Sequence, residues 1–377
     1  MTRSGNLVAR SPVVVDNDTI AELLIREAET AEGHREQALR RAAHAAFMWS
    51  EEGTDIAAAG RSLTELAGIG HSLAKRLHNW IASPPEVEVP AIRREFLTLA
   101  QARRVLKKNP RWAPQLNGDL QMHTTWSDGG GTIADMAAAA IDRGYKFIGI
   151  TDHTQGLSIA GGLDETRLAE QGREIIALNK QLRQRGIDFT ILRSAEMNLS
   201  PEGAGDMRPT ALRKLDLVLG CFHSALRRKE DQTSRYLAAL RNPGIQILGH
   251  PQTRVWNRRE GLKADWSAVF AEATRLDKAV EIDGYVDRQD LRISLLKVAR
   301  KEGVRISLGT DAHHPEQLGF MELSLAAAAL AKIPAERIIN FMSVDQLKSW
   351  AQSVRASSEP KVTRPARSTR ARTLAKV

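Results

Sequence analysis

Hydrophobic and polar positions follow two different patterns along the chain. From residue 19 to about residue 83 the apolar positions recur at helical spacing, and the stretch at 33–50 is rich in alanine. Two further short helices are predicted on either side of Gly68-Ile69-Gly70, and Pro84 and Pro85 end this series because proline cannot continue a helix. Residues 17–85 are therefore predicted to form a small all-helical domain. A charged helix at 91–108, within a linker at 86–116, is predicted to connect it to the rest of the chain.

From residue 117 the pattern changes to short apolar runs separated by longer amphipathic stretches. Seven runs have the length and composition of strands, at 119–122, 147–150, 190–194, 217–221, 245–248, 279–282 and 305–308. Stretches with helical spacing separate most of them, at 133–143, 168–185, 268–275 and 291–302, and terminal helices are expected within 338–350. Repeated βα units imply an α/β fold with a largely parallel sheet, either open or closed into a barrel, over residues 117–351.

Composition narrows the class of protein. Hydrophobic residues make up 42% of the chain and aromatic residues only 5%, so the core is expected to be aliphatic. No apolar run reaches the roughly 20 residues of a membrane span, and the N-terminus lacks a signal-peptide pattern, so no membrane partner is expected. A single cysteine, Cys221, forms no internal disulfide, and a buried structural thiol is favoured over a role in a site. The cytoplasm is the expected compartment.

The net charge of +9 is concentrated at the C-terminus. From residue 352 onward seven basic residues stand against one acid, Glu359, so six of the nine net positive charges lie there. Residues 352–377 lack an apolar period and are predicted to be a disordered basic tail, and residues 1–16 a flexible N-terminus. The tail is either a solvating extension or a weak electrostatic arm for phosphate backbones, so the global charge is poor evidence for nucleic-acid binding.

Residues able to bind metal ions follow nearly every predicted strand. In chain order they are His123, Asp128, Asp152, His153, Glu196, His223, His250, Glu281, Asp283, Asp311 and His313. Because the loops after parallel strands of a βα barrel meet at one rim, these side chains are expected in one site. A lone histidine is more often a buried structural residue, but five of the six histidines after residue 117 lie just past a strand. This recurrence favours a shared metal site, with His314 pointing elsewhere.

The ligand types restrict both the metal and the reaction. Imidazole and carboxylate without thiolate favour Zn²⁺, Mn²⁺ or Fe²⁺ over Ca²⁺. The ligands exceed the needs of one ion, and Glu196 is a natural bridge between ions, so two to three divalent ions are expected. Such a centre suits hydrolysis of phosphate esters, because one ion lowers the pKa of a bound water while others neutralise phosphate oxygens. His123, Glu196, His223 and Asp311 are the expected centre of this chemistry.

At these residues the chain resembles the PHP family, the polymerase and histidinol phosphatase domain. The matching runs are Gly-Asp-Leu-Gln-Met-His-Thr-Thr-Trp-Ser-Asp-Gly at 118–129, Ile-Thr-Asp-His at 150–153, Ala-Glu-Met-Asn at 195–198, Phe-His-Ser at 222–224, Gly-His-Pro at 249–251, Glu-Ile-Asp at 281–283 and Thr-Asp-Ala-His at 310–313. The resemblance implies a distorted seven-stranded βα barrel that usually holds three ions. It implies these ligands: His123, Asp128, His153, Glu196, His223, His250, Asp311 and His313.

Two positions depart from the family pattern. Gln121 stands where the first motif normally has histidine, and a neutral carbonyl is a weaker and harder ligand than imidazole. One ion is therefore expected to be bound loosely, to be replaced by Mg²⁺ or Mn²⁺, or to be missing. Glu281-Ile-Asp283 also differs from the more usual Glu-x-Asn, with Arg288 and Asp290 following in their expected places.

The helical domain adds a second resemblance. Leu66-Ala-Gly-Ile-Gly70 between short helices looks like a helix-hairpin-helix, in which glycines and backbone N–H groups approach a phosphate; a plain helical turn is the alternative. Together with the PHP motifs, it makes the chain similar to bacterial family X DNA polymerases, which carry a polymerase palm between the two modules. Only residues 84–116 separate them here, too few for a palm, so no polymerase activity is expected.

Three functions follow as hypotheses. The first is a phosphoesterase acting on DNA, as a 3′–5′ exonuclease, a 3′-phosphatase or an abasic-site nuclease, with DNA contacts at Gly68, Gly70, Lys75 and Arg76. Arg254 and Arg288 are candidates to hold the substrate phosphate, since a guanidinium binds phosphate bidentately, although either is equally a surface or structural arginine. The second is a phosphatase for a small phosphorylated metabolite, of the histidinol-phosphate type. The third is a DNA-binding protein whose PHP domain lost its activity with the first ligand.

Overall fold

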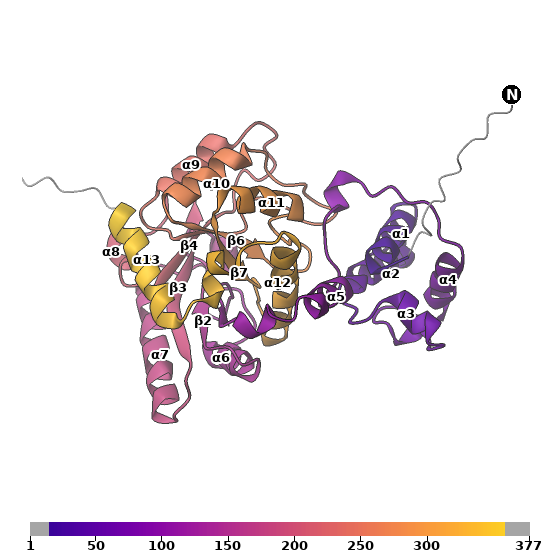
Figure 1. Ribbon diagram of the computed structural model, residues 1–377, viewed down its shortest axis with the longest axis horizontal. Coiled ribbons are helices and arrows are strands. Elements are labelled where there is room, and N and C mark those ends of the chain that lie inside the picture. The colour runs from indigo at the N-terminus through magenta and orange to yellow at the C-terminus, as the bar shows by residue number, and fades with distance from the viewer. Residues whose placement is uncertain (1–14, 359–377) are drawn as a thin grey trace, which may run out of the picture.

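The computed structural model describes residues 15–358, in which a helical module lies against a βα barrel (Figure 1). Most of the predicted flexible N-terminus and of the predicted basic tail falls outside these residues. The tail prediction is wrong for 352–358, which continue the last helix, α13 (Val344–Ser358). The helix continues because Ala351 and Val354 are buried in a hydrophobic cluster against the barrel.

Helices form the N-terminal module, as predicted. They are α1 (Asn17–Glu29), α2 (Gly33–Ala46), α3 (Gly53–Ala58), the 3₁₀ turn η1 (Leu63–Glu65) and α4 (His71–Ala82). The carboxylate of Asp16 accepts a hydrogen bond from the Thr19 N–H at 3.3 Å and caps α1. Ile20 and Leu24 of α1 pack with Leu39 of α2 in one buried cluster, so the module has its own core.

The linker is not the single helix that the sequence predicts. It consists of η2 (Ala91–Arg93), an extended segment, α5 (Leu99–Lys108) and η3 (Ala113–Gln115). Thr98 and Gln101 form a reciprocal capping box that fixes the start of α5. Phe96, just before it, is buried in the core of the helical module. The predicted continuous helix does not form because the backbone is extended around Phe96, which places the Phe96 ring in the core of the helical module.

Seven parallel strands form one sheet in the order of the sequence. They are β1 (Gly118–Asp119), β2 (Phe147–Ile150), β3 (Thr190–Leu199), β4 (Leu217–Phe222), β5 (Ile247–Leu248), β6 (Ala279–Asp283) and β7 (Arg305–Gly309). Every predicted strand is present, although β1 and β5 are shorter and β3 is longer than expected. The predicted α/β fold, a seven-stranded βα barrel after a small helical domain, is confirmed.

The first and last strands meet through a side chain. Nδ2 of Asn340 donates to the carbonyls of Gly118 at 2.9 Å and Leu308 at 2.8 Å, and the Leu308 N–H donates to its Oδ1 at 2.7 Å. One parallel bridge, between Met122 and Ala312, continues this contact beyond the strands. The sheet is thereby nearly closed into a barrel.

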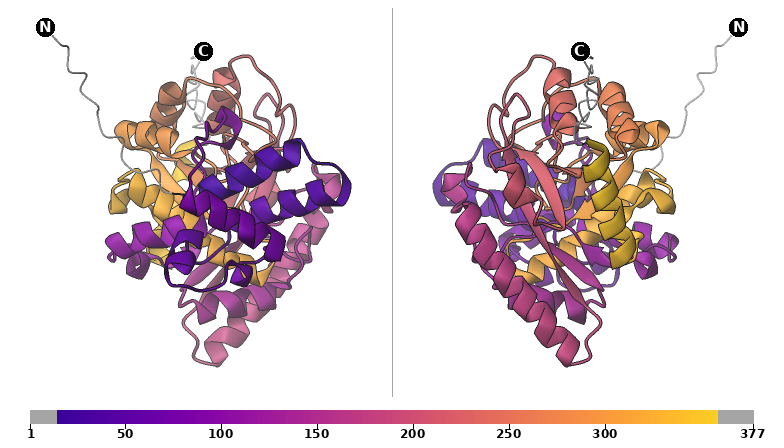
Figure 2. Two further views of the ribbon diagram at one scale, coloured as in Figure 1. Left: turned by 90° about the vertical axis from the view of Figure 1, so that its right-hand side faces the viewer. Right: turned by 90° about the vertical axis from the view of Figure 1, so that its left-hand side faces the viewer.

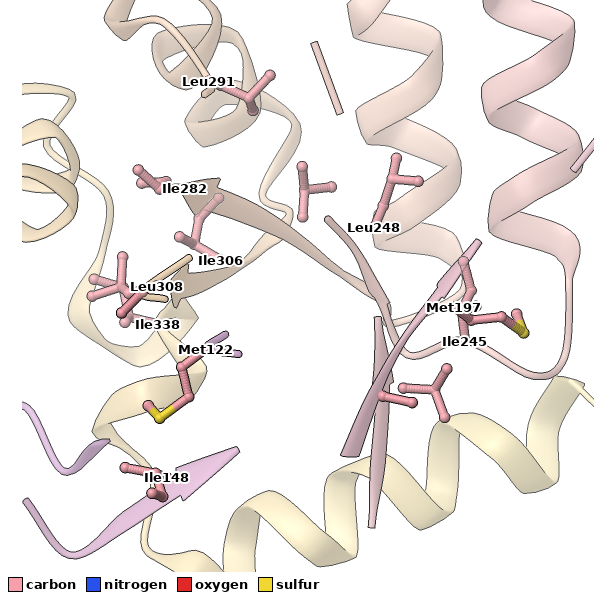
Figure 3. Packing of buried hydrophobic residues seen from close by; sticks show 14 of the residues in the cluster. Met122, Ile148, Met197, Ile245, Leu248, Ile282, Leu291, Ile306, Leu308 and Ile338 are labelled. Atoms are coloured by element: carbon pink, nitrogen blue, oxygen red, sulfur yellow. The ribbon is translucent and has the colours of Figure 1, made fainter. Parts of the chain in front are cut away.

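Helices cover the outside of the barrel. They are α6 (Ile133–Asp142), α7 (Glu165–Gln184), α8 (Pro209–Leu212), α9 (Thr233–Arg241), α10 (Trp266–Arg275), α11 (Ile293–Glu302) and α12 (Met321–Leu330). Short 3₁₀ turns connect them: η4 (Ser158–Ala160), η5 (Pro315–Phe320), η6 (Ala335–Arg337) and η7 (Ile339–Phe341). Apolar residues of different strands, including Ile148, Leu248 and Ile306, belong to one large buried cluster with these helices (Figure 3).

The two ends of the barrel differ in chemistry. At the N-terminal ends of the strands, Phe147 and Leu219 form an apolar cluster with Leu347 and Trp350 of α13. The helical module and α13 lie on opposite sides of the barrel (Figures 1 and 2). One end of the barrel is thus closed by hydrophobic packing, and the polar residues gather at the other.

Candidate metal centre

The predicted metal ligands come together at the C-terminal ends of the strands. The ligand cluster comprises His123, Asp128, His153, Glu196, His223, His250, Asp311 and His313. Glu196, on β3, lies at its centre: its carboxylate oxygens are 2.8 Å from Nε2 of His223, 3.0 Å from Nε2 of His250 and 3.2 Å from Nε2 of His123. A carboxylate that faces three imidazoles from different strands has the geometry of a bridging ligand between ions.

Asp128 organises the second part of the cluster. Its carboxylate oxygens lie 3.6 Å from Nε2 of His153, 3.6 Å from Nε2 of His313 and 3.8 Å from Nδ1 of His123. The His123 ring is stacked on both neighbouring rings, with centroids 4.3 Å from His153 and 4.5 Å from His313. Ligand atoms of these four residues all lie within 4.8 Å of one another, the spacing of a site for one ion.

Asp311 joins the cluster to a cation. Its Oδ1 is 2.9 Å from Nε2 of His123, and its Oδ2 is 3.2 Å from Nη1 of Arg288. Arg288, predicted to contact phosphate, therefore lies beside the ligands, with 34% of its side chain exposed. His123, Glu196 and Asp311 form a further set with ligand atoms within 4.8 Å. Because this set shares His123 with the set around Asp128, ions bound in the two sets would be neighbours.

Orphaned polar atoms test whether the residues fit metal ions. Among the described residues, Nδ1 of His123, Nδ1 of His153 and Oε1 of Gln121 are buried without a hydrogen-bond partner. Buried polar atoms are almost always paired, because an unpaired one costs desolvation energy. These atoms are nitrogen and oxygen donors within a cluster of histidines and carboxylates, which is the donor set of Zn²⁺, Mn²⁺ and Fe²⁺. The residues fit divalent ions, and they do not by themselves select one metal.

The electrostatics of the cluster keep its carboxylates ionised and divide its histidines. Burial opposes the protonated form of His123 and His250, but the neighbouring carboxylates, Asp311 and Glu196 for His123 and Glu196 for His250, raise the pKa of both imidazoles. Burial tends to raise the pKa of Glu196, but the imidazoles that surround its carboxylate, including those of His250 and His123, outweigh burial and hold that pKa well below its usual range. Burial also tends to raise the pKa of Asp128, but the neighbouring histidines, led by His313, outweigh burial and lower this pKa to about 2. Burial lowers the pKa of His153 to about 4. At neutral pH these carboxylates are anionic and this imidazole is neutral, as metal ligation requires.

Gln121 lies beside the ligand cluster, and its side-chain amide is hydrogen-bonded to one of the ligands. It is fully buried, and its Nε2 donates to Oε2 of Glu196 at 3.0 Å. Its unpaired Oε1 is the atom that it can offer to an ion. Glu281, on β6, likewise accepts from the His250 N–H at 2.8 Å while its Oε1 has no partner among the described residues. The expectation of a weakened ion at Gln121 stays a prediction.

Two residues outside the ligand cluster, Asn198 and Asp152, orient the ligands, a role that the sequence analysis does not predict for them. Nδ1 of His223 is hydrogen-bonded to Oδ1 of Asn198 at 3.0 Å, which leaves Nε2 facing Glu196. Asp152 accepts from the Thr124 N–H at 2.8 Å and from other donors, and it fixes the loop that carries Asp128. Strand alternation offers the signal, because Asn198 lies two residues after Glu196 on the same face of β3.

Cys221 also lies beside the cluster. Its Sγ is within 4.8 Å of ligand atoms of Glu196 and His250, and the residue is fully buried. Burial, with the nearby carboxylates, raises the pKa of the thiol well above its ordinary value. A neutral buried thiol agrees with the structural role predicted from the sequence. His314 is exposed, as expected.

The structure does not bring Arg254 to the cluster. The residue is 1% exposed, its guanidinium lies 3.7 Å above the Phe96 ring, and its Nη2 donates to the Arg94 carbonyl at 2.6 Å. Burial lowers its pKa to about 9. The proximity of Arg254 to His250 in sequence suggested a phosphate contact, but the intervening loop turns this side chain away to the helical module.

The hairpin residues lie in the helical module. Gly68, with φ of +80°, and Gly70 are exposed in the turn before α4, and η1 precedes that turn. Lys75 is exposed on α4, while Arg76 forms an ion pair with Glu27 of α1. The predicted arrangement of two helical segments around the turn is present, and its contact with DNA stays a prediction.

Comparisons with known proteins place these features in context. No family model matches the chain. It is 35% identical over 237 residues to DNA polymerase/3′-5′ exonuclease PolX of Bacillus subtilis (strain 168), covering 63% of this chain and 41% of that protein. It is 29% identical over 219 residues to a probable phosphatase of Caldicellulosiruptor saccharolyticus, covering 55% of this chain and 84% of the relative. The chain thus spans less than half of the first relative and most of the second.

One solved structure also matches. Histidinol phosphate phosphatase from Lactococcus lactis, complexed with zinc, L-histidinol and phosphate, aligns with a TM-score of 0.40 and 16% identity over 64% of this chain and 93% of that chain. Within residues 15–358, no helix combines the length and the apolar character needed to cross a membrane.

Proposed function

We propose that the chain, which is similar to DNA polymerase/3′-5′ exonuclease PolX and to probable phosphatases, is a PHP-domain hydrolase that cleaves phosphate esters with two to three divalent ions at the barrel rim. The observation that carries the proposal is the convergence of three imidazole nitrogens within 3.2 Å of the Glu196 carboxylate. A structural role accounts poorly for so many buried titratable groups in one place, because burying each of them is costly without a compensating ligand.

The residues of the chain divide the work of the site. When bound, the ions would lower the pKa of a water and neutralise phosphate charge. The ligand cluster holds them, with Asn198 fixing the orientation of His223. Arg288, anchored by Asp311 and partly exposed, is placed to bind a phosphate oxygen of the substrate.

We propose DNA ends or abasic sites as the substrate. Two observations support this: the similarity to a protein named as a 3′-5′ exonuclease, and an exposed glycine turn at the start of α4. Backbone N–H groups at a helix start form a favourable phosphate site, and glycine permits close approach. Residues 84–116 hold only two short 3₁₀ turns and α5, so the proposal includes no polymerase activity.

The test is hydrolysis of labelled oligonucleotides. In Mn²⁺, 3′-labelled DNA should be shortened or dephosphorylated, and His223→Ala should abolish this turnover because it removes a ligand facing Glu196. His314→Ala is the matched control, since that histidine is exposed and outside the ligand cluster. Equal loss in both variants, or no hydrolysis of any phosphate ester by the metal-loaded protein, would contradict the proposal.

A second candidate is a phosphatase for a small phosphorylated metabolite. The relatives named as probable phosphatases favour it, because this chain spans 84% of the length of one of them. Efficient hydrolysis of a sugar or amino-alcohol phosphate, together with inert DNA, would select this function over the first.

A further inference from the structure

Two loops of the barrel rim carry functional side chains and also contact the helical module. The β5 loop, residues 249–262, carries the ligand His250 as its second residue. The β6 loop, residues 284–292, contains Arg288, which is bound to Asp311. Contacts between the module and these loops bear on the metal centre, because each loop has one end at the ligand cluster.

Trp256 is the deepest contact from the β5 loop. It is 5% exposed and belongs to the hydrophobic core of the helical module rather than to that of the barrel. Its ring meets Phe47 edge to face, with centroids 5.1 Å apart, and His44 at 5.6 Å. Aromatic pairs of this kind contribute about 0.5–1.5 kcal/mol beyond their buried area. The module therefore holds the tip of this loop in its core.

Arg254 forms the second contact. Its guanidinium stacks on Phe96 of the linker at 3.7 Å and donates to the carbonyl of Arg94. Asn257 adds a third, because Nη1 of Arg93 donates to its Oδ1 at 2.7 Å. An arginine that is 1% exposed is expensive to bury, so this arrangement depends on the linker being in place.

Gln289 ties the β6 loop to the linker. Its Oε1 accepts from the Leu97 N–H at 2.7 Å, and its Nε2 donates to the Leu97 carbonyl at 2.8 Å. This pair of bonds holds the residue next to Arg288. The two loops are also joined to each other, because the Trp256 N–H donates to the Asp287 carbonyl at 2.7 Å and the Gln252 N–H donates to Asp290 at 3.0 Å.

We propose that the helical module, together with the linker that packs on it, is a positioning element of the metal centre, and that Arg254, Trp256 and Gln289 are positioning residues which hold His250 and Arg288 in place. The inference rests on the proposed metal-dependent hydrolysis. It separates two roles of the module: the exposed turn at Gly68–Gly70 would serve DNA, while the buried contacts would serve every substrate. Even an ester too small to touch the hairpin should then depend on the docked module.

The test compares the loss of the loop contacts with a loss of packing inside the module core. Trp256→Ala removes the contact to the β5 loop, and Gln289→Ala removes the contact between the linker and the β6 loop. Leu24→Ala is the matched control, because Leu24 is fully buried in the module core on α1 and belongs to neither loop. Trp256→Phe keeps an aromatic ring and should rescue function. Melting temperature is recorded for all four variants, so that effects are compared at known stability.

Three measurements read the outcome. Hydrogen–deuterium exchange of the metal-free protein should show faster exchange in 249–262 for Trp256→Ala and in 284–292 for Gln289→Ala. Mn²⁺ affinity should fall in Trp256→Ala, because His250 is released. With bis(4-nitrophenyl) phosphate, kcat should fall roughly tenfold to a hundredfold, the usual range for residues that orient ligands, while Leu24→Ala stays near wild type.

Unchanged loop exchange and Mn²⁺ affinity in Trp256→Ala would overturn the inference, as would an equal fall of kcat in Leu24→Ala. If the wild type hydrolyses no ester at all, the proposed function fails, and the exchange and Mn²⁺ data still decide whether the module positions the loops. The failure of one proposal is therefore distinguishable from the failure of the other.

Discussion

The barrel rim and the helical module treat charge in opposite ways. At the rim, carboxylates and histidines are buried together and face one another, with Glu196 and His123 fully enclosed. In the module, cations pair with acids near the surface, as Arg76 does with Glu27 and Arg61 with Glu65. The rim needs ions from outside to satisfy its donors, whereas buried acids of the module pair with cations of the chain itself, as Glu22 does with Arg93 and Glu52 with Arg104 of the linker. The difference indicates that the rim acts through bound metal and the module through shape and backbone.

The largest effect is expected from Glu196→Gln at the rim. The substitution removes the charge that three histidines face while keeping the size of the side chain, so fewer ions should bind and kcat should fall on the order of a thousandfold. Elemental analysis and kinetics on a chromogenic phosphodiester measure both. Full metal content with full activity would place the reaction elsewhere.

A smaller effect is expected from Gly70→Val in the module. The backbone φ of Gly70 is −87°, and a carbon added there meets no atom of the described residues within 4 Å, so folding should be preserved. Close approach of a phosphate would be blocked, and DNA affinity should fall about tenfold, the loss of one good phosphate contact. The measurement is the ratio of DNA turnover to diester turnover. An unchanged ratio would make the turn merely structural.

The pH dependence of stability should separate the same regions. Burial, aided by Asp16, raises the pKa of Asp18 in the module to about 8, against the lowered pKa of Asp128 at the rim. Between about pH 4 and pH 8 the folded state holds a proton on Asp18 that the unfolded state has lost, so this contribution to stability falls as pH rises. Asp18→Asn should remove a slope of at most about 1.4 kcal/mol per pH unit.

Denaturant unfolding at pH 5 and pH 8 checks this prediction. The variant should gain stability relative to wild type at pH 8 and much less at pH 5. The opposite order would mean that Asp18 is ionised in the folded module.

The smallest effect is expected from Gln121→His within the rim. An imidazole in place of an amide that is hydrogen-bonded to Glu196 should raise the metal content by up to one ion per chain, with a modest change in rate. Elemental analysis under defined Zn²⁺ or Mn²⁺ measures it. Unchanged stoichiometry would mean that Gln121 already serves as a ligand through Oε1 or that this site is dispensable.

Much of the site could be predicted because its signal is local. Each ligand follows or ends a short apolar run, and parallel strands bring such positions to one rim, so His153, His223 and His250 could be placed before any coordinates. The parallel sheet followed from the alternation of strands and helices, and its closure into a barrel followed from the resemblance to the PHP family. The strand β2 has the predicted bounds. The spacing of residues along the chain was sufficient to place a side chain wherever that residue lies in a strand or directly after one.

Prediction failed where distant contacts decide the local path. Phe96 enters the core of the module and breaks the expected linker helix, and Ala351 and Val354 extend α13 into the expected tail. Arg254 turns away from the rim in a loop where Thr253 has a φ of +57°. No periodicity records such turns, because their cause lies in residues far away in the sequence.

The position of α13 has a practical consequence. This helix covers the apolar end of the barrel and lies on the side of the molecule away from the helical module (Figure 1). A fluorophore or a surface anchor attached at Ser357, which is exposed on this helix, would therefore leave both the rim and the hairpin accessible. Single-molecule observation of the immobilised protein on long DNA is then feasible without obstructing either region.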